Sequence, residues 1–221
     1  LQALKTGQLP LMWLALWMIG NVSLFGSAYQ VPFAKSLGFG PLIAASSAGV
    51  LSVVNGTGRA FVGWVSDRLG RKQTLLMVLL VEAIAQVGLL YSGKAHLEIP
   101  FLAMAFLAGF GGGAFFPLFA ALVPDYFGEN HNAQNYGIVY SAKLASSLVG
   151  IGLGSVVINS LGYTGAYWIG AGVALVSAGF VLLLRQPQTP PTAPREAPVA
   201  AREERRPLAT RELATAGSGG D

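Results

Sequence analysis

Three ionisable residues interrupt long apolar stretches of this sequence: Arg59, Glu82 and Lys143. A charged side chain at the centre of a membrane-spanning helix costs about 2.5 to 3.5 kcal/mol on insertion scales, so such residues normally face a partner or a water-filled cavity. Two cations and one carboxylate leave a net positive interior. The chemistry that these residues indicate is therefore the binding of an anion, with Arg59 and Lys143 as its ligands.

The elements that position these residues follow from the composition. The 221 residues are 53% hydrophobic and 11% charged, and only 14 of the 24 Lys, Arg, Asp and Glu residues lie in residues 1–185. Soluble domains carry about one charge in four residues, so this segment is expected to lie in lipid. The absence of cysteine excludes a disulfide-rich secreted scaffold, and the short basic clusters exclude an extended nucleic-acid surface.

Six apolar stretches are each long enough to cross a bilayer as a helix, which takes about 20 residues. Alternation with a period of two is absent, which argues against a barrel. We therefore predict an all-α membrane protein, with a six-helix bundle over residues 1–185 and a disordered cytoplasmic tail over residues 186–221. The predicted spans are Pro10–Phe33, Leu42–Val65, Thr74–Tyr91, Phe101–Val123, Asn135–Ile158 and Ala166–Leu184.

The basic residues predict the orientation, because cytoplasmic loops carry an excess of Lys and Arg. An even number of spans puts both termini on one side, which we predict to be the cytoplasmic side of a cell inner or plasma membrane. The opposite side has Lys35 and Lys94. The cytoplasmic side collects Lys5, Arg68, Arg71, Lys72, Arg185 and the tail arginines.

The loop between the second and third predicted spans has a specific pattern, G-x-x-x-D-R-x-G-R-K, formed by Gly63, Asp67, Arg68, Gly70, Arg71 and Lys72. A tight turn needs the backbone freedom of Gly70. We expect Asp67 to meet the N-terminal end of the following helix, while Arg68, Arg71 and Lys72 stay in water. The pattern resembles the loop motif of the major facilitator superfamily, and every defining position is filled.

This resemblance covers residues 1–185 and implies a fold. In that family twelve helices form two halves, each half consists of two inverted three-helix repeats, and substrate binds between the halves near the midplane. Six spans followed by a tail are similar to the C-terminal half. Since the chain begins with Leu1, we expect a fragment whose N-terminal six-helix half is a missing partner.

The two cations are predicted to lie at similar depth. At about 1.5 Å of rise per helical residue, Arg59 lies roughly 10 Å and Lys143 roughly 12 Å from the cytoplasmic side. Each belongs to a helical stripe of polar or small residues, which suits a cavity lining better than lipid. The alternatives are snorkelling of either cation to the headgroups, or an ion pair between Arg59 and Glu82. The stripes contain Ala48, Ser52, Asn55 and Arg59, and Tyr136, Tyr140, Lys143, Ser147, Gly150 and Gly154.

An Arg in the eighth helix and a Lys in the eleventh resemble the paired cations of the oxalate/formate antiporter family, which bind the two carboxylates of oxalate. Placed in a C-terminal half, Arg59 and Lys143 fall on those two helices. The resemblance implies a transporter that exchanges small carboxylates, with Tyr140 and Asn55 lining the site beside the two cations. That family often has a Trp at the place of Tyr140, so this position departs from its pattern.

The proton-linked monocarboxylate transporters, which carry lactate-like and pyruvate-like anions, are the rival resemblance. They share the eighth-helix Arg, but they have an Asp four residues earlier, where this sequence has Asn55. An asparagine cannot titrate, and this difference favours anion exchange. Glu82 is then either a carrier of the coupling proton or a buried structural partner of Gln86, four residues later.

The remaining patterns predict no further chemistry. The Gly109–Gly113 run lies inside an apolar stretch and indicates a close helix contact or hinge rather than a phosphate loop. His96 and His131 lie far apart in sequence, and no nucleophile and base occur together in an aqueous loop. We therefore predict no metal site, no cofactor and no enzymatic activity. A function of another class, a truncated or scaffolding membrane protein that transports nothing, is the last alternative.

Overall fold

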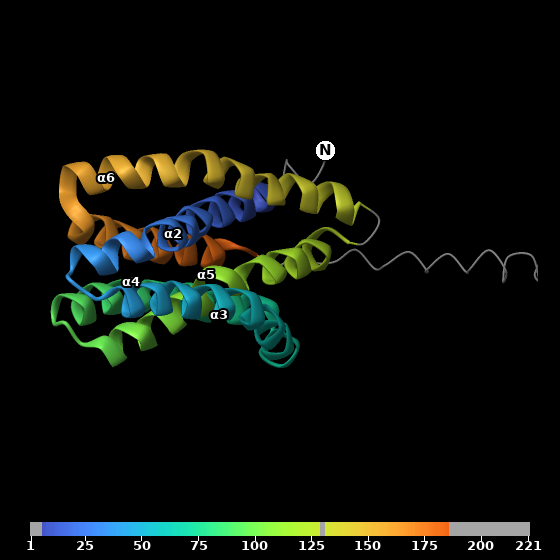
Figure 1. The fold of residues 1–221 in the computed structure, drawn as a ribbon. Coiled ribbons are helices and arrows are strands. Elements are labelled where there is room, and N and C mark those ends of the chain that lie inside the picture. Colours follow the sequence, from blue (N-terminus) through green and yellow to red (C-terminus); the bar gives the residue numbers. More distant parts are fainter. Residues whose placement is uncertain (1–5, 129–130, 186–221) are drawn as a thin grey trace, which may run out of the picture. The chain divides into compact units, whose positions relative to one another are not determined.

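The computed structural model describes residues 6–128 and 131–185, and these residues form five α-helices. In chain order they are α2 (Gln8–Ser36), α3 (Pro41–Leu69), α4 (Arg71–Lys94), α5 (Glu98–Phe127) and α6 (Asn132–Leu183) (Figure 1). The prediction of an all-α fold is confirmed. The tail predicted over residues 186–221 lies outside the described residues, and so does Lys5.

The longest helix, α6, reverses its direction at Gly162. This residue has φ 67° and ψ 179° inside a helix of 52 residues, a backbone conformation that essentially only glycine adopts. Figure 1 shows the chain turning back partway along α6. The two predicted spans Asn135–Ile158 and Ala166–Leu184 both lie largely within α6, one on each side of Gly162.

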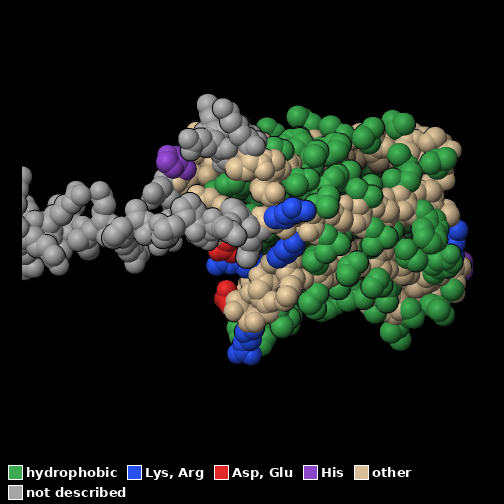
Figure 2. Space-filling view, turned by 180° about the vertical axis from the view of Figure 1, so that it is seen from behind, with side chains coloured by type: hydrophobic (Ala, Val, Ile, Leu, Met, Phe, Trp, Pro, Cys, Tyr) green, Lys and Arg blue, Asp and Glu red, His purple; other side chains and the backbone are tan. Residues whose placement is uncertain are grey.

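The helices have the length and the surface that a membrane requires. Among the described residues, α2, α4, α5 and α6 are long and apolar enough to cross a bilayer. In α3 the predicted span Leu42–Val65 is helical throughout, but this helix also carries Arg59, Asp67 and Arg68, which reduce its apolar character. Hydrophobic side chains cover most of the face in Figure 2, and the charged side chains gather toward its ends.

Two apolar clusters hold the helices together. One contains Leu16 and Phe115, and the other contains Phe33, Phe101 and Tyr167. Each cluster takes residues from all five helices, with α2 packed mainly on α6 and α3 packed mainly on α5. The rings of Phe33 and Tyr167 lie 4.3 Å apart between centroids. This packing fixes α3, α5 and α6 relative to one another, and these are the helices that carry the candidate site.

The glycine run of α5 brings this helix against α3. A Cβ on Gly109 would collide with the backbone of Leu51, and a Cβ on Gly113 would collide with Asn55. Because the two glycines are four residues apart, they lie on one face of α5 and leave room for α3 along a full turn. The close helix contact predicted for this run is confirmed.

We expect Gly109→Ala to lower the midpoint of thermal unfolding, because the added methyl group meets the Leu51 backbone and overpacking of a tight contact costs about 1 to 3 kcal/mol. Gly152→Ala in α6 is the matched control, since a Cβ there has nothing within 4 Å. Circular dichroism of both variants in detergent measures the midpoints. Equal midpoints would contradict the tight contact between α3 and α5.

Candidate functional site

Arg59 of α3 and Lys143 of α6 meet at one aromatic ring, that of Phe116 on α5. The guanidinium carbon of Arg59 lies 5.4 Å from the centroid of this ring, and Lys143 Nζ lies 4.9 Å from the same centroid. Both distances are within the range of about 6 Å for cation–π attraction. The separation of the two charges therefore cannot exceed the sum of these distances, and the fold brings the two predicted cations together.

Arg59 is exposed and is oriented by its own helix. Its Nη2 donates a hydrogen bond to Asn55 Oδ1 at 3.2 Å, one turn earlier in α3. Asn55 in turn packs against Gly113 of α5, which limits its movement. A guanidinium carries five N–H donors. Among the described residues, Arg59 donates a hydrogen bond only to Asn55. Most donors of Arg59 are therefore available to an anion.

Lys143 is half-buried and faces aromatic side chains. Its Nζ donates a hydrogen bond to Tyr140 Oη at 3.1 Å, and it also lies 5.4 Å from the centroid of the Tyr140 ring. The Tyr140 ring meets Phe116 edge-on at 6.2 Å and Tyr136 at 5.3 Å between centroids. The rings of Tyr140, Tyr136 and Phe116 thus form an aromatic wall beside Lys143, with contributions from α5 and α6.

Phe116 is the site residue that the sequence did not indicate. It lies in an apolar stretch beside Phe115, and nothing in the spacing distinguishes the two rings. The structure does so, because Phe115 is buried in the core while Phe116 is half-buried and faces both cations. To identify Phe116, one would need to know how α5 is rotated about its axis relative to α3 and α6.

The arrangement suits an anion with two charged ends. Arg59 offers a planar fork that matches a carboxylate, and Lys143 offers a compact point charge. Neither cation forms an ion pair with a carboxylate in the part of the chain that the structure describes. Two neighbouring cations repel each other, so an anion placed between them would lower the electrostatic energy of the site.

Glu82 does not join this site. Its side chain is 2% exposed on α4, and Gln86 Nε2 donates a hydrogen bond to Glu82 Oε1 at 2.7 Å. The i, i+4 pair that the spacing predicts therefore forms. The alternative of an ion pair between Arg59 and Glu82 is wrong, because residues 6–128 and 131–185 contain a single ion pair and Glu82 is not in it.

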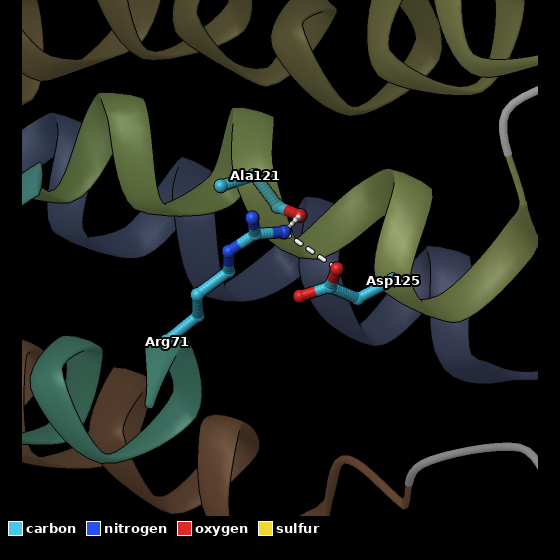
Figure 3. Close-up of polar contacts among 3 residues, drawn as sticks. All are labelled: Arg71, Ala121 and Asp125. Carbon is cyan, nitrogen blue, oxygen red and sulfur yellow. Dashed lines mark hydrogen bonds and ion pairs between the residues drawn. The ribbon is translucent and has the colours of Figure 1, made fainter. Parts of the chain in front are cut away.

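Arg71 of the loop motif ties α4 to α5. Its Nη1 donates a hydrogen bond to Asp125 Oδ1 at 2.5 Å and another to the carbonyl oxygen of Ala121 at 2.6 Å (Figure 3). The turn that precedes Arg71 is made by Gly70, which has φ 92°. A side chain is strained at this angle, so the predicted need for glycine in the turn is confirmed.

Lys72, the next residue, ties α4 to the end of α6. Its Nζ donates hydrogen bonds to the carbonyl oxygens of Leu182 at 3.0 Å and Leu184 at 2.5 Å. The last carbonyl groups of a helix attract cations. The prediction that Arg71 and Lys72 stay in water is wrong in part, since both are half-buried and bind carbonyl groups of α5 and of the end of α6.

The other residues of the motif make fewer contacts. Arg68 is exposed as predicted, and its guanidinium carbon lies 4.0 Å from the centroid of the Trp64 ring. Asp67 is exposed and α4 begins without a side-chain cap, so among the described residues Asp67 accepts no hydrogen bond from the helix end that it was expected to meet. A Cβ on Gly63 would have nothing within 4 Å.

Comparison with known proteins identifies a family whose sequences resemble this chain. A sequence profile of the Major Facilitator Superfamily matches residues 11–217. The chain is similar to the oxalate:formate antiporter of Oxalobacter formigenes, with 31% identity over 184 residues that cover 82% of this chain and 44% of that protein. It is also similar to monocarboxylate transporter 12-B of Danio rerio, with 26% identity over 157 residues that cover 70% of this chain and 32% of that protein.

A solved structure has a similar fold. The crystal structure of the POT family transporter PepTSo matches with a TM-score of 0.66 and 21% identity, over 85% of this chain and 39% of that one. This match concerns the fold alone. The chain spans less than half the length of each of these three proteins.

We expect Arg71→Gln to lower the midpoint of thermal unfolding more than Asp125→Asn does, because it also removes the hydrogen bond to the Ala121 carbonyl. The two charged side chains are 34% and 37% exposed, and such pairs contribute about 0 to 1 kcal/mol. A double-mutant cycle in detergent measures the coupling, which should weaken as salt is added. A coupling that is insensitive to salt would contradict this description of the pair.

Proposed function

This chain belongs to the Major Facilitator Superfamily, and on that basis we propose that it forms half of a secondary transporter that exchanges small carboxylate anions, of the oxalate and formate type, by alternating access. The protein is an integral, multi-pass membrane protein. The observation that carries the proposed substrate class is the meeting of Arg59 and Lys143 at the ring of Phe116.

Each residue of the site has a role in this proposal. Arg59 holds one carboxylate with two parallel hydrogen bonds, and Lys143 attracts the second carboxylate as a point charge. Asn55 and Tyr140 orient the two cations through their hydrogen bonds and line the site. Phe116 is an apolar wall that both cations face, and by excluding water it strengthens their attraction for the anion.

The similarity to the oxalate:formate antiporter supports this substrate class. A dicarboxylate matches the pair of cations, because each carboxylate meets one positive charge. The donors that Arg59 and Lys143 leave unused are sufficient for both carboxylates.

A proton-coupled monocarboxylate transporter is the second candidate, and the similarity to monocarboxylate transporter 12-B favours it. Asn55 argues against a proton carrier four residues before Arg59, because its amide accepts a hydrogen bond from Arg59 and cannot carry a proton at that position. A single carboxylate would also leave one of the two cations without a counter-charge. We therefore favour exchange of anions that include a dicarboxylate.

For the topology we propose six spans, with the segments of α6 on either side of Gly162 counted as two. The first inverted repeat then consists of α2, α3 and α4, and the second consists of α5 and the two segments of α6. A further six-helix half would complete the substrate site between the halves. From the positive-inside rule we propose that both termini are cytoplasmic, and we propose an inner or plasma membrane as the location.

We expect Arg59→Gln and Lys143→Gln each to reduce uptake of labelled oxalate by about tenfold or more, because a hydrogen bond to a charged group contributes about 1.5 to 3 kcal/mol. The measurement uses the complete protein, with any further segments encoded with it, in liposomes loaded with formate or oxalate. Arg185→Gln and Lys35→Gln are matched controls, since both side chains are exposed and lie outside the site. Undiminished exchange by either site variant would overturn the proposal.

The same assay tests the role of Phe116. We expect Phe116→Leu to raise the oxalate concentration needed for half-maximal uptake about fivefold to thirtyfold, because the variant loses two cation–π contacts of about 0.5 to 1 kcal/mol each. Phe106→Leu is the matched control, since Phe106 is an exposed side chain on the same helix. If the two variants have equal affinity for oxalate, Phe116 is not part of the binding site.

A further inference from the structure

A buried carboxyl group lies outside the anion site, at Glu82 of α4. Its side chain is 2% exposed, and that of Gln86, one turn later, is fully buried. Glu82 Oε1 accepts the hydrogen bond from Gln86, while Glu82 Oε2 has no hydrogen-bond partner among the described residues. The proposed anion exchange makes no use of this carboxyl.

The helices packed around Glu82 bring no cation to it within the described ranges. From α5, Gly111 and Gly112 lie close to Oε2. From α2, Ser23 donates a hydrogen bond to the carbonyl oxygen of Gly112 and so lies beside the same turn of α5. From α6, the buried Tyr167 is the titratable group that interacts electrostatically with Glu82. The surroundings of the carboxyl are therefore neutral.

A negative charge on Glu82 would be costly in these surroundings. An unpaired carboxylate buried in a low dielectric costs several kcal/mol, and a position at the centre of a membrane-spanning helix is equally unfavourable for a charge. A bound proton removes this cost. It also makes Oε2 a hydrogen-bond donor in a region where Gln86 Oε1 and Tyr167 Oη lack partners.

The glycine run of α5 links this carboxyl to the anion site. A Cβ on Gly111 would collide with Glu82, and a Cβ on Gly113 would collide with Asn55, which accepts the hydrogen bond from Arg59. A single turn of α5 therefore packs tightly against both groups. A movement of α5 relative to α3 and α4 changes the surroundings of Glu82 and of Asn55 together.

We propose that Glu82 is a proton-binding site that releases and takes up one proton as the protein alternates between conformations. This inference rests on the proposed transport function, since the transport cycle supplies the movement. In the conformation described here, the carboxyl is enclosed and holds its proton. When α5 moves away, water reaches Oε2, the O–H bond breaks, and the proton leaves as hydronium while the carboxylate remains on Glu82.

Infrared spectroscopy of the complete protein in lipid vesicles at neutral pH tests this site without a transport assay. The spectrum should contain the carbonyl-stretch band of a protonated carboxylic acid, and Glu82→Gln should lose it. The band should shift on transfer to D₂O, because the proposed opening lets the proton exchange. Glu98→Gln is the matched control, since Glu98 is exposed at the start of α5 and should leave the band unchanged.

The outcomes separate this proposal from the proposed function. If there is no band, or if Glu82→Gln keeps it, Glu82 is ionised and the proton site is overturned; a band that appears only after sodium is removed points to a bound Na⁺ and has the same consequence. If the band does not shift in D₂O, the carboxyl is permanently closed and the exchange of its proton is overturned. Failure of oxalate uptake, with the band and its shift intact, overturns the anion assignment and leaves the proton site in place.

With oxalate uptake intact, a further comparison tests the link between the two sites. Oxalate should accelerate the shift of the Glu82 band in D₂O by opening the enclosed conformation more often. Arg59→Gln should keep the band but lose this acceleration, because it does not bind oxalate. An exchange rate that oxalate leaves unchanged would overturn the coupling of the proton to the transport cycle.

Discussion

The cost of placing a charge in an apolar interior governs this molecule. A membrane offers no water to solvate an ionised side chain, so each charge needs a partner within the protein, a route to the surface or an anion from outside. Arg71 and Lys72 use the first solution, with partners at the ends of α5 and α6. Arg59 and Lys143 differ, because their partners in the described residues are an amide, a hydroxyl and aromatic rings.

That choice of partners keeps the positive charge available. An ion pair between Arg59 and a carboxylate would neutralise the site, and a substrate anion would then have to displace the carboxylate before it could bind. A cation–π contact attracts the cation without cancelling its charge, and it is worth only about 0.5 to 2 kcal/mol. The enclosure of Glu82 behind α5 is consistent with this requirement, because it separates the carboxyl of Glu82 from both cations.

The residues that could be predicted from the sequence are those whose signal lies within one helix. Arg59 and Lys143 were identified because charges are rare in apolar stretches, and the pair of Glu82 with Gln86 follows from a spacing of four residues. Phe116 was missed because its role depends on how α5 is rotated against two other helices. The partners of Arg71 and Lys72 were missed for the same reason, since their acceptors lie about 50 and 110 residues away along the chain. Hydropathy predicted a gap between two spans in this part of the chain. In the structure the chain reverses there at a single residue with non-helical backbone angles, Gly162.

The sequence of α5 explains how one helix can pack against both Glu82 and Asn55. Gly109, Gly111 and Gly113 permit close approach to α3 and α4, and the aromatic ring of Phe116 follows within one turn. Pro117 has no N–H group, so the carbonyl of Gly113 loses its regular hydrogen-bond donor four residues later. The helix therefore lacks one backbone hydrogen bond between the turn that touches Asn55 and the ring that faces the two cations. A bend at this point would move Phe116 relative to Arg59 and Lys143, which is the movement that the proposed alternating access requires of a helix at the proposed anion site.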